Sequence, residues 1–335
     1  MTGEEALVAR LQQALGTAGL TGGSVALGIG DDAAVLVPPA GSLRLVVTVD
    51  MLVEGQHFRL GPGGFSPEDV GWKALAVNLS DVAAMGASPL WALCSLGVPD
   101  GTPDDLLERV YRGMGDLARR HQVRLVGGNL ARSPGGLVLD VTVIGQTYRP
   151  ITRRGARRGD RIFVTGFLGA AAAGLEVLTR GLDLDASGAA LLLSAQCRPS
   201  PRLAEAQAIA ALAPGMVHAM CDVSDGLVAD LRHLLGGLGA VLWEQELPIP
   251  SAAFRAADHL PGADPIAWAL GGGEDYELLI VAPPEAEEAI LEVLRQGAGA
   301  RCIGEVTPGL VCLAPRPGGH AVPLGEMGWD PFRQR

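Results

Sequence analysis

The feature that most restricts the fold of this 335-residue chain is a series of acidic residues at the ends of apolar segments. The first lies in Gly28-Ile29-Gly30-Asp31-Asp32, which leads directly into the apolar run 33–37. Adjacent side chains of an extended segment point to opposite faces, so at most one aspartate can face a core and the other needs water, a cation or a donor. Taken alone, the stretch is more typical of a solvated turn, because Gly and Asp are common turn residues.

The rest of the chain alternates β-branched or apolar runs with segments of helical spacing, which predicts an α/β fold with mixed sheets. In this prediction Asp50 ends a strand, and Asn78 and Asp81 share one face of a helix. We expect helices over residues 4–15, 67–85, 103–121, 168–179, 201–212 and 227–235, with another after Pro283. We expect strands over residues 43–49, 89–98, 123–126, 137–146, 161–165, 217–221 and 276–281.

A chain of this length is expected to form two domains. The segment 148–160 contains proline and five arginines and interrupts the hydrophobic pattern, as domain junctions do. We therefore predict an N-terminal domain over residues 1–148 and a C-terminal domain over residues 149–335.

Composition argues against several classes of protein. The net charge of −11 disfavours binding to nucleic acids and anionic membranes, which attract clustered Lys and Arg. We find no apolar run of about 18 residues and no N-terminal signal pattern, so a cytoplasmic location is expected. The cysteines form no CxxC pair, which argues against a disulfide framework or a structural zinc site.

The chain has a single lysine, Lys73, and 25 arginines. Its surroundings, Gly71-Trp72-Lys73-Ala74, do not form a phosphate-binding GxxxxGK[ST] loop, so a P-loop nucleotide site is excluded. We place Lys73 within a helix, away from any phosphate-binding loop.

Five element ends carry acids next to glycine or hydroxyl residues, which suggests that the acids converge on one site. Clustered carboxylates repel each other and raise each other's pKa unless a cation joins them. Mg²⁺ suits such a cluster because it binds a few carboxylates and keeps positions for water and phosphate. Calcium storage is disfavoured because the DxDxDG loop is missing. The acids are Asp31-Asp32, Asp50, Asp81, Asp222 with Asp225, and Glu274-Asp275.

Three further signals leave alternatives open. The segment 165–169 could hold an anion, but it is more typical of a tight turn. His57, a lone histidine beside phenylalanine, is more often structural than functional. Trp329 could stack on a flat ring or simply cover the core.

As a set, the motifs of this chain resemble those of the thiamine-monophosphate kinase family, which is part of the aminoimidazole-ribonucleotide-synthetase-like superfamily. The resemblance runs from Gly28 to Trp329 and implies a two-domain fold whose N-terminal domains pair through their sheets in a homodimer. It also implies a kinase that transfers the terminal phosphoryl group of ATP to the phosphate of thiamine monophosphate, with several Mg²⁺ ions. The motifs are GIGDD (28–32), TVD (48–50) with HF (57–58), NLSDVAAMGA (78–87), SDGL (224–227) and GGEDYEL (272–278).

The resemblance also assigns site residues. The implied metal ligands are Asp32, Thr48, Val49, Asp50, Asp81, Asn129, Asp222 and Asp225. The implied ATP contacts are Tyr111, Gly128, Arg153 and Ser224. The implied contacts to thiamine monophosphate are His57, Glu274 and Trp329.

The side-chain chemistry of Arg153 and Asn129 bears on their implied roles. Arg153 is suited to stabilise phosphate charge, because a guanidinium donates paired hydrogen bonds to phosphate oxygens. Asn129 stands where the family usually has aspartate, and an amide offers a metal its carbonyl oxygen but no negative charge. We name no general base, because a phosphate acceptor is already anionic at neutral pH.

Two rival functions remain from the sequence. The first is another ATP-dependent enzyme of the superfamily, such as selenophosphate synthetase or the maturation factor that modifies its terminal cysteine. The reactive cysteines of those enzymes are missing, since the N-terminal glycine-rich stretch holds no Cys and the chain ends in Arg335. The second is a catalytically silent nucleotide- or thiamine-binding regulator, for which Asn129 is the only hint.

Overall fold

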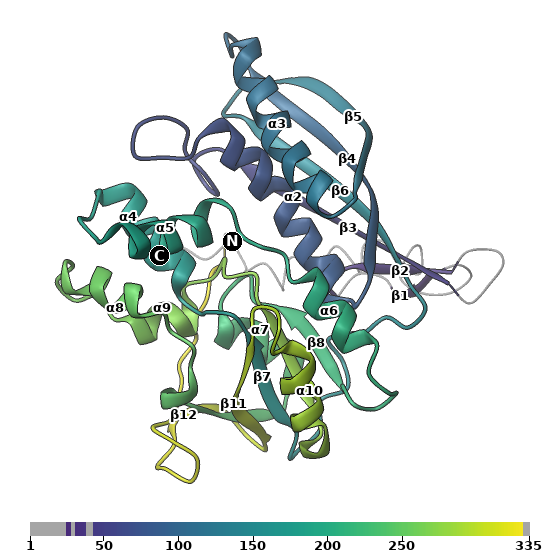
Figure 1. Ribbon diagram of the computed structural model, residues 1–335, viewed down its shortest axis with the longest axis vertical. Coiled ribbons are helices and arrows are strands. Elements are labelled where there is room, and N and C mark those ends of the chain that lie inside the picture. Colours follow the sequence, from purple (N-terminus) through teal and green to yellow (C-terminus); the bar gives the residue numbers. More distant parts are fainter. Residues whose placement is uncertain (1–24, 28–30, 38–42, 331–335) are drawn as a thin grey trace.

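The computed structural model describes residues 25–27, 31–37 and 43–330, and it contains two mixed sheets with helices packed around them (Figure 1). The helix predicted over residues 4–15 and the glycines of the first motif lie outside the described residues. Among the described residues, no helix combines the length and the apolar character that crossing a membrane requires.

The N-terminal half forms a six-stranded sheet in the order β1-β2-β3-β6-β4-β5. Neighbouring strands are antiparallel except for the parallel pair β4 and β5. Strand β5 lies at one edge of the sheet. The strands are β1 (Val25–Leu27), β2 (Ala34–Leu36), β3 (Arg44–Val53), β4 (Ser88–Pro99), β5 (Arg124–Ser133) and β6 (Val138–Thr147).

Two long helices, α2 (Pro67–Ala84) and α3 (Asp104–Arg120), pack together beside this sheet. The start of α2 is as predicted, because Ser66 and Asp69 form a reciprocal capping box and proline occupies the first turn. The N-cap of α3 is Pro103, which provides no side-chain cap. The two helices approach closely at Gly71 and Gly113.

The C-terminal half forms a seven-stranded sheet in the order β13-β12-β9-β11-β7-β10-β8. Its strands are β7 (Arg161–Thr165), β8 (Ala219–Asp222), β9 (Gly239–Trp243), β10 (Leu278–Ala282), β11 (Ala300–Thr307), β12 (Val311–Ala314) and β13 (Val322–Pro323). Its α-helices are α4 (Ala170–Arg180), α5 (Ala186–Cys197), α6 (Leu203–Ala210), α7 (Leu227–Leu235), α8 (Ser251–Asp258), α9 (Pro265–Gly271) and α10 (Glu287–Leu294).

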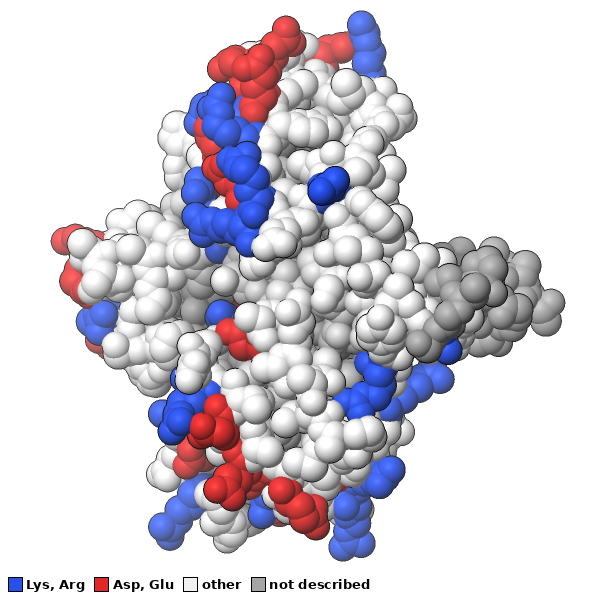
Figure 2. All heavy atoms as spheres, turned by 45° about the vertical axis from the view of Figure 1, so that its right-hand side comes forward, with Lys and Arg blue, Asp and Glu red and all other residues white. Residues whose placement is uncertain are grey.

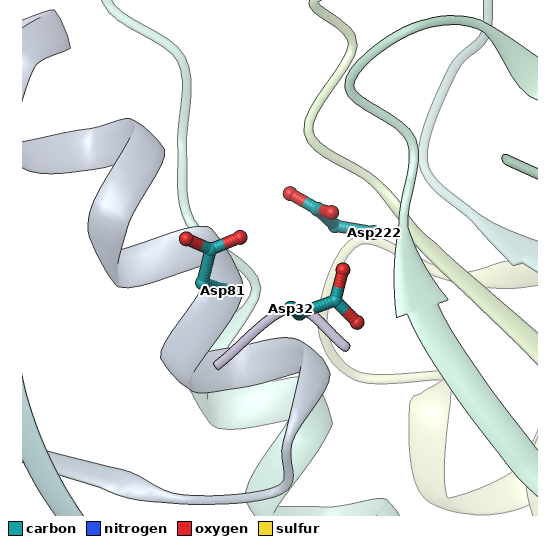
Figure 3. A group of neighbouring side chains, drawn as sticks. All are labelled: Asp32, Asp81 and Asp222. Atoms are coloured by element: carbon teal, nitrogen blue, oxygen red, sulfur yellow. The ribbon is translucent and has the colours of Figure 1, made fainter. Parts of the chain in front are cut away.

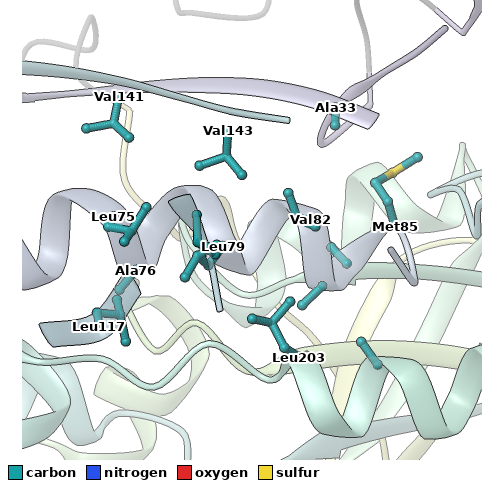
Figure 4. Close-up of a cluster of buried hydrophobic side chains, with 14 of the residues drawn as sticks. Ala33, Leu75, Ala76, Leu79, Val82, Met85, Leu117, Val141, Val143 and Leu203 are labelled. Atoms are coloured by element: carbon teal, nitrogen blue, oxygen red, sulfur yellow. The ribbon is translucent and has the colours of Figure 1, made fainter. Parts of the chain in front are cut away.

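Helix α2 is buried on almost every side because both halves of the chain pack against it. Figure 4 shows Leu79 and Val82 of α2 between Val143 of β6 and Leu203 of α6. The same hydrophobic cluster includes Phe163 and other side chains of the second sheet. The two halves therefore share one core, and α2 runs through it.

Several element boundaries differ from the prediction. Strand β3 continues through Asp50 to Val53, so this acid lies inside a strand and not at its end. Strand β5 continues through the paired glycines and Asn129 to Ser133, where we predicted a short strand ending at 126. Helices α5, α8 and α9 and strands β9, β11 and β12 were not predicted. The first sheet ends at Thr147 and the second begins at Arg161, and the junction at residues 148/149 stays a prediction.

The close approach of α2 and α3 gives a test of the packing. A Cβ atom on Gly113 would lie 1.9 Å from the backbone oxygen of Glu68, so Gly113→Ala forces the helices apart. We expect this change to lower the free energy of unfolding by about 1–3 kcal/mol, measured by equilibrium denaturation.

Gly115 lies on the same helix and provides a matched control. A Cβ atom there would meet only the Arg119 side chain, at 3.4 Å. Gly115→Ala should therefore be neutral or stabilising by up to about 1 kcal/mol, as expected from helix propensity. Equal effects of the two substitutions would contradict the close contact.

Candidate active site

Three carboxylates from distant parts of the chain gather at the junction of the two halves. Each of Asp32, Asp81 and Asp222 offers an oxygen that lies within 4.8 Å of the other two. Figure 3 shows that Asp81 comes from α2, Asp222 from the end of β8, and Asp32 from the segment before β2. The predicted convergence of acids is therefore present for these three residues, which we call the carboxylate cluster.

The alternation of side chains along β3 brings two more predicted residues to this cluster. Thr48 and Asp50 point toward α2, whereas Val49 points to the opposite face and is 57% exposed. The Thr48 hydroxyl donates to Asp81 Oδ2 at 2.5 Å, and the Asp50 carboxyl lies within hydrogen-bonding reach of Asp81. Val49 can therefore contribute only its backbone to such a site.

Helix α2 also fixes its neighbours through two polar side chains. Asn78 Oδ1 accepts a hydrogen bond from the backbone N–H of Asp50 at 3.1 Å. The Ser80 hydroxyl donates to Asp222 Oδ2 at 2.5 Å, and this bond joins the two halves of the chain. The predicted helical face of Asn78 and Asp81 thus has specific partners on β3.

Arg153 lies over the first acidic pair. Its guanidinium is ion-paired with Asp32 and its Nε lies 3.7 Å from Asp31 Oδ1. Its backbone N–H also donates to Asp31 at 3.2 Å. Both aspartate side chains are buried, so the expectation that at most one faces the interior was wrong, because residues 31–33 form a bend and not an extended strand. Each acid does have a donor or a cation, as expected.

Crowding and burial perturb the acidity of the cluster. Burial raises the pKa of Asp32 to about 8, against the opposing charge of Arg153. Burial also raises the pKa of Asp222 to about 6 and that of Asp81 well above its ordinary value, with the neighbouring carboxylates adding to the shift at Asp81. Asp32 Oδ2 is buried without a hydrogen-bond partner among the described residues. Such a donor set fits Mg²⁺, which binds carboxylate oxygens and would remove the repulsion.

The turn after β8 is organised by an acid that sequence reasoning missed. The buried Asp230 accepts hydrogen bonds from the backbone N–H groups of Ser224, Asp225 and Gly226 at 3.0–3.1 Å. The backbone N–H of Trp329 donates to Asp225 O at 2.9 Å. The predicted residues Ser224, Asp225 and Trp329 therefore lie together beside the cluster, although the Asp225 carboxylate is not among its three members.

The adjacent acids Glu274 and Asp275 have different partners. Asp275 accepts hydrogen bonds from the backbone N–H groups of Gly169 and Ala171, so it caps α4 and does not join the cluster. The loop 165–169 thus holds an internal carboxylate. Glu274 has a left-handed backbone, with φ of +61°, and Lys73 and Gln196 contact its carboxylate. The sequence assigned Lys73 no role in the site, whereas the structure places its ammonium group against the Glu274 carboxylate.

Of the other predicted residues, His57 lies near the acids of the site, whereas Gly128, Asn129 and Tyr111 lie at the β4–β5 edge of the first sheet, which β6 separates from β3. His57 accepts a hydrogen bond at Nδ1 from the backbone N–H of Val53 at 3.0 Å, and its ring lies near Asp50 and Glu274. Gly128 pairs so closely with β4 that a Cβ atom would lie 1.8 Å from Cys94 O. Asn129 follows it on the exposed edge strand β5, and Tyr111 of α3 lies against Cys94.

Comparison with known proteins agrees with this arrangement. Two family models match the chain, "AIR synthase related protein, N-terminal domain" over residues 30–147 and "AIR synthase related protein, C-terminal domain" over residues 157–311. The chain is 38% identical to the thiamine-monophosphate kinase of Escherichia coli K12, with 98% of both chains covered. The chain belongs to the thiamine-monophosphate kinase family. A second member, from Aquifex aeolicus, is 37% identical over 80% of this chain and 85% of its own.

Solved structures of this family superpose on the whole chain. A structure described as AaThiL complexed with AMPPCP and TMP matches with a TM-score of 0.83 and 33% identity, covering 98% of this chain and 97% of that one. The hydrogenase maturation protein HypE of E. coli matches with a TM-score of 0.67 at 23% identity, covering 96% and 97%, and shares the fold.

The raised pKa of Asp81 predicts an unusual effect on stability. The ionised carboxylate is disfavoured in the folded chain, so its cost is absent below the pKa of an unfolded aspartate, about 3.9, and grows as the pH rises. In chelator at pH 8 we expect Asp81→Asn to melt higher than the wild type, by about 1–2 °C for each kcal/mol relieved. The difference should shrink at pH 5.

Asp116→Asn is the matched control, because Asp116 forms a surface pair with Arg119 on α3. Exposed pairs contribute little, so this substitution should leave the melting temperature nearly unchanged. A lower melting temperature for Asp81→Asn at pH 8 in chelator would contradict the repulsion within the cluster.

Proposed function

We propose that this chain is a Mg²⁺-dependent kinase that transfers the terminal phosphoryl group of ATP to the phosphate of thiamine monophosphate, forming thiamine diphosphate and ADP. Membership of the family and the likeness to a structure described with AMPPCP and TMP support the two substrates. The observation that carries the metal dependence is the carboxylate cluster of Asp32, Asp81 and Asp222.

In this proposal the cluster holds Mg²⁺ together with Thr48, Asp50 and Asp225. The strand register places Asn129 in one row with Ser95, Asp140 and Met51, on the face that carries the Val49 side chain, so the Asn129 amide points away from the cluster. Bound Mg²⁺ would neutralise charge on the phosphate oxygens and align them. Val49 would contribute its backbone carbonyl, because its side chain points to the other face of the sheet. No residue is required as general base, since the acceptor phosphate is an anion.

The ATP phosphates would lie between the cluster and Arg153, whose guanidinium already occupies this side of the site. Ser224 would contact ATP from the turn after β8, and Gly128 and Tyr111 would contact it from the β4–β5 edge of the first sheet, where both lie against Cys94. The thiamine end of the second substrate would contact His57, Glu274 and Trp329. The 39% exposure of Trp329 leaves part of its ring available for stacking.

We also propose a homodimer formed through the outer face of the N-terminal sheet. Exposed apolar side chains gather there, and a surface of this kind commonly marks an interface. The view of Figure 2 brings this side forward and shows few charged side chains over the N-terminal half, apart from a strip along one edge. The exposed side chains that the strand register places on this face are Val49, Met51 and Trp91.

The net charge of −11 supports a further part of the proposal, the absence of a nucleic-acid partner. The cytoplasmic location expected from the sequence stays a prediction. Both would be tested by the location of the native protein in cell fractions and by its retention on immobilised DNA.

The kinase activity has a direct test. With ATP, thiamine monophosphate and Mg²⁺, the purified chain should form ADP and thiamine diphosphate in equal amounts, separated and quantified by chromatography. Chelation of Mg²⁺ should abolish the reaction, and Asp81→Asn should lower kcat by about 100-fold or more, because several kcal/mol of charge stabilisation depend on the metal. Binding of thiamine monophosphate without product would instead indicate the silent regulator.

The dimer proposal predicts a change in mass. The wild type should sediment at about twice the chain mass of 34.5 kDa, and Trp91→Glu should sediment as a monomer because it buries a charge in the interface. Leu310→Glu is the control, since Leu310 is also an exposed apolar residue, 66% against 42% for Trp91, but lies in the C-terminal half. A wild type that sediments as a monomer would exclude this interface.

A further inference from the structure

Among the described residues, Lys73 is the one basic residue whose side chain is fully buried. It lies in the middle of α2, and its Nζ is 2.7 Å from Glu274 Oε1 in the C-terminal half. The described part of the chain offers Nζ no other hydrogen-bond partner. The Phe65 ring lies 5.2 Å from the same nitrogen. Glu274 is therefore the one anion that this buried charge engages.

Two buried side chains contact the Glu274 carboxylate. Lys73 contacts Oε1, and Gln196 Nε2 of α5 donates to Oε2 at 2.9 Å. The Lys73 side chain is completely buried, whereas the Glu274 side chain is 29% exposed. A carboxylate has about four acceptor positions, so both oxygens keep capacity toward the open side.

The backbone fixes the direction from which Glu274 reaches this place. Its left-handed conformation is secured by its N–H, which donates to Ser224 O at 2.7 Å, and by the N–H of Tyr276, which donates to Val223 O at 2.8 Å. A non-glycine residue adopts this conformation only where its surroundings determine it. Backbone hydrogen bonds to the turn that contains Ser224 and Asp225 therefore set the direction of the Glu274 side chain.

The sequence itself sets Lys73 apart. Every other basic residue of the chain except the histidines is arginine, 25 in all, yet the buried position has lysine. An ammonium is a compact point charge on a flexible stem, whereas a guanidinium is a wide planar fork. The space between Phe65 and Glu274 accommodates the smaller cation.

We propose that Lys73 is a positioning residue for the phosphate acceptor, holding the Glu274 carboxylate ionised and oriented toward thiamine monophosphate across the junction of the two halves. The inference rests on the proposed contact between Glu274 and this substrate. Removal of Lys73 would free the carboxylate to turn or take up a proton, and either change weakens an interaction with a cationic ring system. The ATP site, on the other side of the cluster, would be unaffected.

The test is Lys73→Met, which keeps most of the buried stem and removes the charge. We expect the KM for thiamine monophosphate to rise by about tenfold or more, with the KM for ATP changed by less than about twofold and kcat by less than about threefold. A purely structural role would lower the melting temperature without separating the two KM values. An unchanged KM for thiamine monophosphate, or an equal rise for both substrates, would overturn the proposal.

A double-mutant cycle isolates the pair. In the background of Glu274→Gln, adding Lys73→Met should change the KM for thiamine monophosphate by less than about twofold, because the carboxylate through which the lysine acts is gone. Additive effects of the two substitutions would show that Lys73 acts by another route.

Two other variants complete the design. Arg198→Met removes a different cation that joins α2 to the end of α5, through Asp69, without touching Glu274, so both KM values should stay within about twofold of the wild type. Gln196→Met removes the other support of the carboxylate and keeps the proposal testable if Lys73→Met does not fold. It should raise the KM for thiamine monophosphate by about threefold or more and leave that for ATP unchanged.

Failure of this inference can be told from failure of the proposed function. If the wild type forms no thiamine diphosphate, the kinase proposal fails, and titration calorimetry with thiamine monophosphate still tests Lys73. A dissociation constant about tenfold weaker for Lys73→Met supports the positioning role, and equal constants overturn it.

Discussion

Repulsion among buried carboxylates is the constraint on which the rest of this structure depends. Asp32, Asp81 and Asp222 share one small space, and burial alone already disfavours their charged forms. The residues that the structure describes supply one cation there, Arg153, together with hydroxyl donors from Thr48 and Ser80. One positive charge cannot balance three carboxylates in a poorly solvated place, so the site needs further cations when the acids ionise. The same imbalance favours the binding of a divalent cation such as Mg²⁺, as the proposed function requires.

Helix α2 is the element that makes this arrangement rigid. It has no polar face, because the first sheet, α3 and the C-terminal half all pack against it. Its buried polar side chains therefore have defined partners on three segments: β3, β8 and the loop before β10. Asn78 holds the backbone of β3, Ser80 holds Asp222, and Lys73 holds Glu274. The geometry of the candidate site is in this sense a consequence of the packing of one buried helix.

Local signals in the sequence predicted a large part of the fold. The capping residues at Ser66 placed the start of α2 correctly, and β-branched runs located most of the strands that carry site residues. The strand ends were less accurate, because pairing with β6 and β4 extends β3 and β5 past the polar residues that should have stopped them. Function was accessible from the spacing of acids and from the family motifs. The partners of those acids were not, because contacts such as Ser80 with Asp222 join residues far apart in the chain. Nor does any local pattern distinguish Asp275, which caps a helix, from Glu274 beside it.

The order of polar residues along α2 has a consequence for how a substrate can lie in the site. Lys73 and Asp81 are eight residues apart, which corresponds to about 12 Å along the helix axis. The end near Asp81 belongs to the carboxylate cluster, where phosphates and cations would meet, and the end near Lys73 carries the Glu274 carboxylate. Thiamine monophosphate has the matching polarity, with a phosphate at one end and a cationic ring system at the other. A single rigid helix can therefore set both the distance and the direction of the acceptor. Because Asp222 and Glu274 reach α2 from the C-terminal half, this register exists only when the two halves are packed together.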